Sequence, residues 1–479
     1  MSTFDSINPT RPTEVLETFE LSDEHAVDVA VGKASAAQVK WSQVPIPARA
    51  DVILRAAEIL ETRKPEFATL VAREVGKILV EAGGDVQEAI DMARFVAGQG
   101  RAAMGNVVPS ELPNKMAYTT RQPVGVVGCI APWNFPIAIP SWKLFPALLA
   151  GNGVVLKPSE FAPKCATEFV KVLVEAGIPQ DLVQVVHGFA EPAAALVVHP
   201  NVGAVSFTGS VPTGRKVAAV AMETGPRLVS LELGGKNAMI VMPDADVDLV
   251  VDGALFGAFG TSGQRCTSTS RLVVHRAIAK TVLDVLIPRV EALKLGDPLD
   301  ASVDVGPVIT LESAERIDGM VNQARAEGAQ VVTGGEQTTV DGCDGGAFYL
   351  PTVLTGVQPS FRIAREEVFG PVLTVIEVDS LDEAVNVVND VEYGLSACIY
   401  TRDINSALHT VDQINTGIVY VNAPTIGAEI PLPFGGTKHT GNGFREAGTR
   451  GIEQFSEIKT VYIDYSGKLQ KAQIDNRPS

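Results

Sequence analysis

The sequence has little of what marks several large protein classes. Basic residues are scarce, since 39 Lys and Arg stand against 56 Asp and Glu, a net charge of −17. Phosphate binding needs a clustered basic surface, so we expect no nucleic-acid partner, and the negative field is a poor match for anionic membranes. No apolar run reaches the roughly 18 residues that a membrane-spanning helix needs. We therefore expect a protein without a membrane segment.

Cysteine and histidine are few and scattered. The odd number of cysteines and the lack of a CxxC pair favour free thiols in a reducing compartment; they are Cys129, Cys165, Cys266, Cys343 and Cys398. The six histidines form no HxH or HxxxH pair, so we predict no metal site. A GxSxG nucleophile elbow is also absent. The N-terminal segment lacks the apolar core of a signal peptide, and we expect a cytoplasmic protein.

What is present indicates a large globular chain. Its 479 residues are 46% apolar and 20% charged, which is ample for a large core and corresponds to about three domains of sequence. Residues 1–105 carry apolar residues mostly at three- and four-residue spacing and predict helices. Residues 115–121 and 457–467 look extended, and such strands can pair with each other or across subunits.

Two long stretches alternate short β-branched runs with helical patterns. Over 124–242 the runs VGVVGCI, GVVLKP, AVSFTG and LVSLEL are separated by predicted helices, and 245–440 repeats the alternation. This pattern predicts βαβ units and parallel sheets. A nucleotide is expected at the carboxyl ends of such strands.

Candidate catalytic residues lie in unusual local settings. Cys266, in GQRCTSTS, follows Arg265, and a nearby positive group favours the nucleophilic thiolate, although most lone cysteines are buried apolar side chains. Glu232 ends an apolar strand before Gly-Gly; burial would suit it to general-base work, and the alternative is a carboxylate satisfied by backbone amides. Asn134, in PWNFP, can donate to an oxyanion or merely stabilise a turn.

Candidate cofactor contacts follow predicted strands. Gly209 and Ser210, in FTGSVPTG, lie at a strand-to-helix junction whose amides can hold a pyrophosphate. Lys157 and Glu160, in LKPSE, can grip a ribose or simply begin a helix. Glu367 follows Glu366 before a Phe-Gly-Pro turn, where one of the two carboxylates can instead cap a helix.

Seven segments in one order make these candidates specific as a set. PWNFP, LKPSE, FTGSVPTG, LELGGKN, GQRC, EEVFGPV and PFGGTKHTGNGFRE span nearly the whole chain. The sequence thereby resembles the aldehyde dehydrogenase superfamily. The resemblance implies an α/β fold with a Rossmann-like cofactor domain (1–104 and 124–234), an α/β catalytic domain (235–440) and a small oligomerisation β element (105–123 and 456–472).

The resemblance also implies a role for each candidate. Cys266 matches the nucleophile that attacks the aldehyde. Asn134, together with the Cys266 N–H, matches the oxyanion hole, and Glu232 matches the base that activates water. The implied cofactor contacts are Lys157 and Glu160 at the adenosine ribose, Gly209 and Ser210 at the pyrophosphate, Ile130 and Trp133 beside the site, and Glu367 and Phe369 at the nicotinamide ribose and ring. Because a carboxylate at position 160 repels a 2′-phosphate, we expect NAD⁺ to be preferred and NADP⁺ to be tolerated.

The substrate side is less defined by the resemblance. Phe135, Trp142 and Phe434 are expected to line an apolar aldehyde tunnel. Arg265 can bind a distal carboxylate or point away and stabilise its loop. Glu446 matches a glutamate that relays protons in some members, but Phe444 is inserted just before Arg445-Glu446, a pattern similar to a semialdehyde-oxidising branch.

There are two alternatives to an aldehyde dehydrogenase that releases the free acid. A coenzyme A-acylating dehydrogenase fits less well, because such members lack the glutamate matched by Glu232. A catalytically silent, crystallin-like relative is disfavoured since nucleophile, base and oxyanion donor are all present. A homodimer or homotetramer is implied by the family's usual assemblies.

Overall fold

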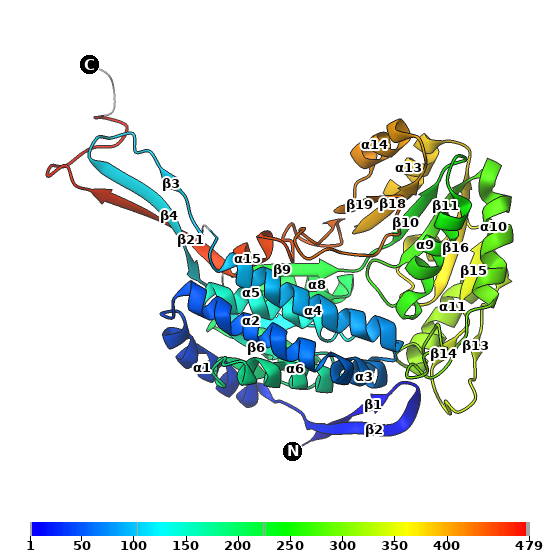
Figure 1. The fold of residues 1–479 in the computed structure, drawn as a ribbon, viewed down its shortest axis with the longest axis horizontal. Coiled ribbons are helices and arrows are strands. Elements are labelled where there is room, and N and C mark those ends of the chain that lie inside the picture. Colours follow the sequence, from blue (N-terminus) through cyan, green and yellow to red (C-terminus); the bar gives the residue numbers. More distant parts are fainter. Residues whose placement is uncertain (1, 103, 224, 226, 476–479) are drawn as a thin grey trace.

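Two helix-covered sheets and a protruding β arm make up the molecule (Figure 1). The computed structural model describes residues 2–102, 104–223, 225 and 227–475. The sheets lie side by side, and the arm extends from the smaller one away from the larger (Figure 1). The predicted α/β fold class is confirmed.

The smaller sheet has five strands, all parallel, in the order β7-β6-β5-β8-β9. Two of its strands are buried at every position, as expected for parallel strands covered on both faces. The strands are β5 (Val126–Ile130), β6 (Gly153–Lys157), β7 (Val183–Val185), β8 (Val202–Gly209) and β9 (Leu228–Leu233).

Helices cover both faces of this sheet, because successive strand residues point to opposite sides. On one face pack α1 (Glu24–Trp41), α7 (Ala190–Val198) and α8 (Val211–Glu223). On the other pack α2 (Ile46–Thr62), α3 (Lys64–Val75), α4 (Leu79–Gln99), α5 (Ala138–Ala150) and α6 (Pro163–Glu175).

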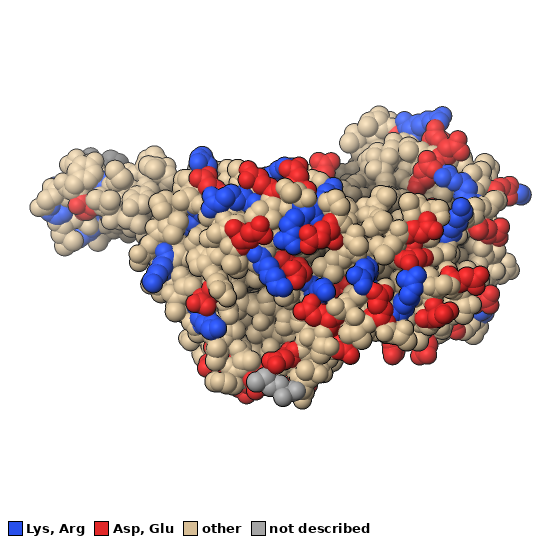
Figure 2. All heavy atoms as spheres, turned by 60° about the horizontal axis from the view of Figure 1, so that its bottom comes forward, with Lys and Arg blue, Asp and Glu red and all other residues tan. Residues whose placement is uncertain are grey.

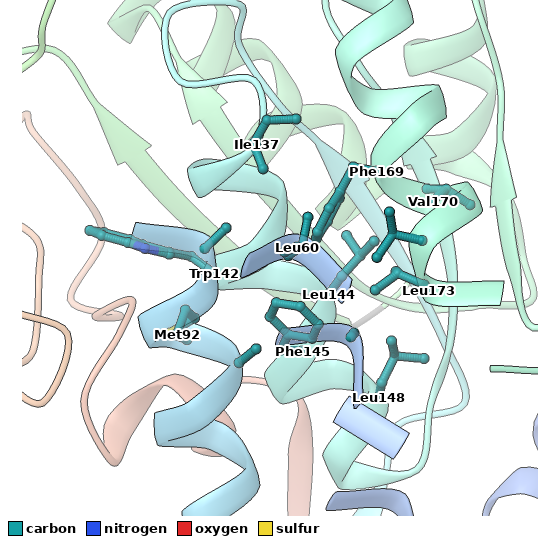
Figure 3. Close-up of a cluster of buried hydrophobic side chains, with 14 of the residues drawn as sticks. Leu60, Met92, Ile137, Trp142, Leu144, Phe145, Leu148, Phe169, Val170 and Leu173 are labelled. Atoms are coloured by element: carbon teal, nitrogen blue, oxygen red, sulfur yellow. The ribbon is translucent and has the colours of Figure 1, made fainter. Parts of the chain in front are cut away.

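Helix α5 lies at the centre of the second face and fixes the turn before it. Figure 3 shows its apolar side chains among those of α2, α4 and α6, and the Phe145 ring meets the Phe169 ring edge-on at 5.7 Å. The Asp85 carboxylate accepts from the Ala138 N–H at 2.7 Å, which caps the first turn of α5. The PWNFP turn that precedes α5 is therefore anchored from both the core and α4.

The larger sheet has seven strands in the order β12-β15-β16-β11-β10-β18-β19, parallel except for β12 at one edge. Helices α9 (Val247–Phe259) and α10 (Arg276–Glu291) cover one face, and α11 (Leu311–Glu327), α12 (Arg362–Arg365) and α13 (Leu381–Asn389) the other, with α14 (Ile404–Gln413) beside α13. Its strands are β10 (Asn237–Val241), β11 (Thr269–His275), β12 (Gln330–Thr333), β15 (Thr352–Thr355), β16 (Val372–Val378), β18 (Ser396–Tyr400) and β19 (Ile418–Val421).

The arm joins an early and a late strand of the same chain. β4 (Lys115–Pro123) pairs antiparallel with β21 (Ser456–Asp464), which follows the short helix α15 (Arg450–Glu453), and β3 (Val107–Val108) adds to the other edge. The two segments expected to be extended thus pair within one chain. The remaining short pairs are β13 (Gln337–Thr338) with β14 (Phe348–Tyr349) and β17 (Tyr393–Gly394) with β20 (Thr437–Lys438).

The helical prediction for residues 1–105 is wrong over residues 3–20. They form a hairpin of β1 (Thr3–Asn8) and β2 (Arg11–Glu20), in which the Phe4 and Phe19 rings lie 5.9 Å apart. Alternating Thr, Val and Phe side chains favour a strand, and the three- and four-residue apolar spacing begins only with α1.

The domain boundaries stay predictions, although the sheets fall inside them. The five-stranded sheet lies within 124–234 and the seven-stranded sheet within 235–440. Residues 1, 103, 224 and 226 of the predicted cofactor domain lie outside the described residues. On the face drawn in Figure 2, basic and acidic side chains are intermixed.

Candidate active site

The five-stranded sheet brings most of the predicted cofactor residues to one edge. Ile130 ends β5, Lys157 ends β6, Gly209 ends β8, and Glu232 is the penultimate residue of β9. Because all these strands are parallel, their carboxyl ends lie along the same edge. Residues up to 102 positions apart in sequence therefore meet through topology, from Ile130 to Glu232.

A cavity of about 540 Å³ lies at that edge and is mostly apolar. It is lined by six of the predicted cofactor residues, Ile130, Trp133, Lys157, Glu160, Gly209 and Ser210, together with residues of α7 and α8. A volume of that order suits a small organic ligand held by few polar groups.

Lys157 and Glu160 form the polar side of the cavity. The Lys157 ammonium lies 3.4 Å from a Glu160 carboxylate oxygen. Burial lowers the pKa of Lys157, an effect that the neighbouring Glu160 opposes. A cation and a carboxylate side by side offer both a donor and an acceptor to a ligand's hydroxyl groups.

The strand-to-helix junction after β8 needs its glycines. A Cβ on Gly209 would lie 2.6 Å from the Phe207 ring, and one on Gly214 would lie 2.5 Å from the Leu233 side chain. Because Gly214 lets α8 approach β9 closely, the start of α8 is held at the cavity wall. Amide groups at such a helix start favour a bound anion.

Glu367 lies beside the Leu233–Gly235 segment. One of its carboxylate oxygens accepts from the Gly235 N–H at 3.2 Å, and a Cβ on Gly234 would collide with the other oxygen. Burial raises the pKa of Glu367 to about 7, against the effects of the Gly235 amide and the Lys236 ammonium. Glu366, by contrast, is exposed and bonds Arg362 at 2.7 Å, so it takes the helix-stabilising role.

Phe369 bridges this carboxylate to the cofactor cavity. Its backbone is left-handed, with φ of 50°, and its ring meets the Trp133 ring edge-on at 5.6 Å. Trp133 itself lines the cavity. The contact between these two rings therefore connects the cavity with the segment that carries Glu367.

Cys266 follows a short 3-10 turn, η1 (Gly260–Gly263), at the end of α9, and it is partly buried. Burial raises the pKa of its thiol, and the negative charges of Glu367 and Glu232 raise it further. The expectation that Arg265 would favour the thiolate is not met. The Arg265 guanidinium instead lies 3.3 Å from a Glu81 carboxylate oxygen and donates to Thr261 Oγ1 at 2.9 Å.

Asn134 lies next to the nucleophile loop. Its side chain is buried, and Nδ2 donates to the Gln264 carbonyl at 3.0 Å, two residues before Cys266. An amide nitrogen carries two hydrogens, so a second one stays available to an acceptor near the sulfur.

Glu232 is buried without a hydrogen-bond partner for either carboxylate oxygen among the described residues. Burial raises its pKa, the charge of Glu446 raises it further, and Lys143 and Arg445 oppose the shift. Its negative charge, like that of Glu367, acts on the Cys266 thiol. A carboxylate with raised pKa and free lone pairs can accept a proton from a nearby water.

Glu446 is tied to a lysine that the sequence did not single out. It forms a buried ion pair with Lys143, and Lys143 also donates to Ser206 Oγ at 3.0 Å. The inserted Phe444 leaves the Glu446 backbone paired with Phe434 in both directions, at 2.7 and 2.8 Å.

The predicted tunnel residues form three ring contacts. Trp142 and Phe434 meet edge-on at 4.9 Å. The Phe135 ring lies 3.3 Å from the Lys77 ammonium and 5.5 Å from the Arg265 guanidinium carbon. The pairing of Arg265 with Glu81 favours the alternative in which this arginine stabilises its loop.

Sequence reasoning missed several residues of this centre. Glu81 and Glu88 lie seven positions apart on α4, a spacing that places both on one helix face. Burial raises the pKa of the half-buried Glu88 to about 8, and its charge acts on Cys266. Lys143 and Asn237 adjoin apolar residues in the sequence. A polar side chain in such a setting was the signal that could have identified them.

Other kinds of site are not found in the described part of the chain. No group of three or more His, Cys, Asp or Glu residues there could hold a metal ion. None of the helices in the described ranges has the length and hydrophobicity that crossing a bilayer requires.

Comparison with known proteins gives consistent matches along the chain. The model of the Aldehyde dehydrogenase family matches residues 1–461. An alpha-ketoglutarate semialdehyde dehydrogenase of Haloferax volcanii is 40% identical over 460 residues, covering 96% of this chain and 95% of that protein. A betaine aldehyde dehydrogenase of Mesorhizobium japonicum is 36% identical over 454 residues, covering 94% and 92%.

Two solved structures are also similar. The NAD-dependent aldehyde dehydrogenase of Sinorhizobium meliloti superimposes with a TM-score of 0.94 at 36% identity, covering 98% of this chain and 93% of that one. The betaine aldehyde dehydrogenase of Staphylococcus aureus in complex with NAD⁺ gives 0.94 at 33% identity, with the same coverage.

Proposed function

The chain belongs to the aldehyde dehydrogenase family, and from that premise we propose that it oxidises an aldehyde to the carboxylic acid with NAD⁺ through Cys266, Asn134 and Glu232. The observation that carries the proposal is the convergence of these three groups. Asn134 bonds the Gln264 carbonyl in the Cys266 loop, and Glu232 acts on the Cys266 thiol.

The residues at the sheet edge fit the cofactor. The apolar cavity takes the adenosine half, with Lys157 and Glu160 at its ribose and the Gly209–Ser210 amides at the pyrophosphate. Glu367, Phe369 and Trp133 hold the nicotinamide half. The glycine at 209, where a Cβ would meet Phe207, supports a close backbone approach to a ligand. When bound there, NAD⁺ would supply the acceptor for the hydride of the substrate.

Cys266 acts as the nucleophile. Its sulfur bonds to the aldehyde carbon, the carbonyl π electrons move to oxygen, and the thiol proton is released. Asn134 Nδ2 and the Cys266 N–H donate to the resulting thiohemiacetal oxygen, and one such donor typically contributes about 10²–10³ in rate. Departure of the hydride re-forms the C=O bond and leaves a thioester on Cys266.

Glu232 then takes a proton from a water molecule. The water oxygen attacks the thioester carbonyl, the carbon–sulfur bond breaks, and the sulfur leaves as the thiolate with the carboxylic acid free. The unpartnered oxygens of Glu232 among the described residues support this role, because a carboxylate held by amides would be a weak base. Transfer to coenzyme A needs no such base.

For the substrate, we propose a semialdehyde with a carboxylate at its far end. Two relatives act on alpha-ketoglutarate semialdehyde by name, at 37% and 40% identity. Besides pairing with Glu81, the Arg265 guanidinium lies 5.5 Å from the centre of the Phe135 ring of the predicted tunnel, which keeps a positive charge at the tunnel wall. The half-buried Glu88 supports a second candidate, a cationic aldehyde such as betaine aldehyde, for which other relatives are named.

The test is NADH formation with alpha-ketoglutarate semialdehyde, betaine aldehyde and a neutral aliphatic aldehyde of similar length. We expect kcat/KM to be at least about tenfold higher for the semialdehyde, because one favourable charge contact is worth about that factor. Cys266→Ala should abolish all three activities. NADH formation by Cys266→Ala at the parent rate would overturn the function, and a preference for betaine aldehyde would shift the substrate to the second candidate.

The arm supports a homodimer or homotetramer. Its side chains Val107, Tyr462, Tyr465 and Leu469 are between 65% and 82% exposed, an amount of apolar surface that a monomer rarely leaves open. Light scattering of the purified protein gives the stoichiometry, and a monomeric mass would contradict the proposal. The five unpaired cysteines support a cytoplasmic location.

A further inference from the structure

The loop that carries Cys266 is held by side chains from outside it. Thr261, Ser262 and Gly263 all have left-handed backbones, with φ of 54°, 53° and 69°. Two of these residues have a Cβ, so the conformation is costly. Contacts with the surrounding protein must hold it in place.

Every carbonyl from Gln264 to Ser268 accepts a hydrogen bond, and four of these five bonds come from side chains. The donors are Asn134 Nδ2 to Gln264 at 3.0 Å, the Ser268 N–H to Arg265 at 3.1 Å, Asn237 Nδ2 to Cys266 at 2.8 Å, Thr425 Oγ1 to Thr267 at 2.7 Å, and Asn237 Nδ2 again to Ser268 at 2.9 Å. Asn237 alone holds two of these carbonyls.

The carbonyl directions determine where the amides point. In a planar trans peptide the C=O of one residue and the N–H of the next point in opposite directions. The bond to the Cys266 carbonyl therefore turns the Thr267 N–H away from Asn237. The bond to the Ser268 carbonyl holds Ser268 in place, and the Ser268 N–H donates to the Arg265 carbonyl. Because the Arg265 carbonyl and the Cys266 N–H belong to one peptide plane, this second bond orients the Cys266 N–H.

Asn237 itself cannot turn. It is the first residue of β10 and is buried, and its Oδ1 accepts from the Ser396 N–H at 3.1 Å. Flipping the amide would place Oδ1 against two carbonyl oxygens and Nδ2 against an N–H. The side chain therefore bonds in one orientation and links the nucleophile loop to strands β10 and β18.

We propose that Asn237 is a positioning residue: its amide fixes the peptide planes on both sides of Cys266, so that the Cys266 N–H faces the substrate oxygen. The inference rests on the proposed function of Cys266 and goes beyond it, because Asn237 is not among the groups that contact the substrate. A close approach supports it, since a Cβ on Gly235 would lie 2.6 Å from the same Cys266 carbonyl.

Asn152 is a matched control with the same hydrogen bonds elsewhere. It is fully buried, donates through Nδ2 to the Ala147 and Phe455 carbonyls at 3.0 and 2.8 Å, and accepts from the Gly125 N–H at 3.1 Å. Asn237→Ala and Asn152→Ala each leave two buried carbonyls without that donor, so both should lower the melting temperature. They differ in the site that they disturb.

The measurement is the single-turnover rate constant of NADH formation with saturating enzyme in excess over aldehyde, which does not depend on the folded fraction. We expect Asn237→Ala to lower it about 10²-fold, as displaced reacting groups do, and Asn152→Ala to leave it within about threefold of the parent. A rate constant for Asn237→Ala within that threefold range, or equal losses in both variants, would overturn the proposal.

Asn237→Asp gives a second readout, also if Asn237→Ala does not fold. A protonated carboxyl donates one hydrogen bond and an ionised one donates none, so the ratio of variant to parent rate constants should rise as the pH falls. Asn152→Asp should show no such trend. A ratio that is independent of pH in Asn237→Asp would contradict the positioning role. Inactivity of the parent with every aldehyde would instead reject the proposed function.

Discussion

The cofactor cavity and the catalytic centre begin at the same sheet edge and are built in opposite ways. The cavity is mostly apolar, and two of its charged groups, Lys157 and Glu160, are paired with each other. The catalytic centre places the thiol of Cys266 and the carboxyls of Glu232 and Glu367 close together, and the pKa of each is raised. The binding region uses polar groups that already have a partner. The catalytic centre uses titratable groups whose pKa values are shifted by their surroundings.

The contrast is sharpest between two carboxylates. Glu160 is partly exposed and has a cation 3.4 Å away, whereas Glu232 is buried and has no hydrogen-bond partner among the residues that the structure describes. If the comparison is right, changes in the catalytic centre should alter rate constants. Changes in the cavity should alter affinity and cofactor choice.

Glu232→Gln should have the largest effect. We expect kcat to fall about 10²–10⁴-fold, the usual contribution of a general base, because the thioester is no longer hydrolysed. The first turnover of NADH should persist, so a pre-steady-state burst is the measurement. Absence of the burst would assign Glu232 to an earlier step.

The same variant tests the cause of the raised pKa. Since burial raises the pKa of Glu232, the folded state binds its proton more tightly than the unfolded state. Its contribution to stability is therefore lost as the pH rises from the ordinary glutamate value through the raised pKa. Glu232→Gln should melt no lower than the parent at pH 8, and a clearly lower melting temperature there would argue for hidden partners of the carboxylate.

Asn134→Ala should have the next effect. Removing one oxyanion donor is expected to lower kcat/KM about 10²–10³-fold. Asn134 does not line the cavity, so the dissociation constant of NAD⁺, measured by calorimetry, should stay near the parent value. Weakened NAD⁺ binding with an unchanged rate constant would instead assign Asn134 to the region that binds the cofactor.

The pH dependence of cofactor binding tests Glu367, which lies between the two regions. Its pKa is raised to about 7, and only the ionised carboxylate can accept from two ribose hydroxyls. Affinity for NAD⁺ should therefore rise about tenfold from pH 6 to pH 8, as the carboxyl loses its proton. Glu367→Gln should bind more weakly and without this dependence; an unchanged pH profile in the variant would remove Glu367 from the site.

The sequence predicted the parallel sheets well, because alternating β-branched runs and helices have local causes. VGVVGCI became β5 and GVVLKP became β6. It failed for residues 3–20, where strand formation depends on cross-strand partners such as Phe4 and Phe19. Pairing between distant segments leaves little trace in local spacing.

The site shows the same limit. Seven motifs indicated Cys266, Glu232 and Asn134 as candidate reacting groups, but the partner of Arg265 was not predictable, because Glu81 lies 184 positions away on α4. Asn237 was passed over within LELGGKN, since its role arises only when β10 meets the nucleophile loop. Motifs identify reacting groups, whereas the groups that orient them depend on tertiary contacts.

Glu160→Ala should have the smallest effect and tests the cavity alone. Its carboxylate lines the cavity beside Lys157, where we propose that it accepts from ribose hydroxyls and repels a 2′-phosphate. Removing it also leaves Lys157 free to pair with that phosphate, so two changes favour NADP⁺. We expect the ratio of kcat/KM for NAD⁺ to that for NADP⁺ to fall about five- to tenfold, the range of a single exposed charge contact.

Glu191→Ala is the control for this change, because Glu191 also acts on the Lys157 charge but does not line the cavity. Its cofactor ratio should stay near the parent value. A single-turnover rate constant with saturating NAD⁺ should be unchanged in both variants, since neither touches the catalytic centre. If Glu160→Ala slowed that step while leaving the cofactor ratio intact, the cavity would take part in the chemistry, and the division between a region that binds and a region that reacts would not hold.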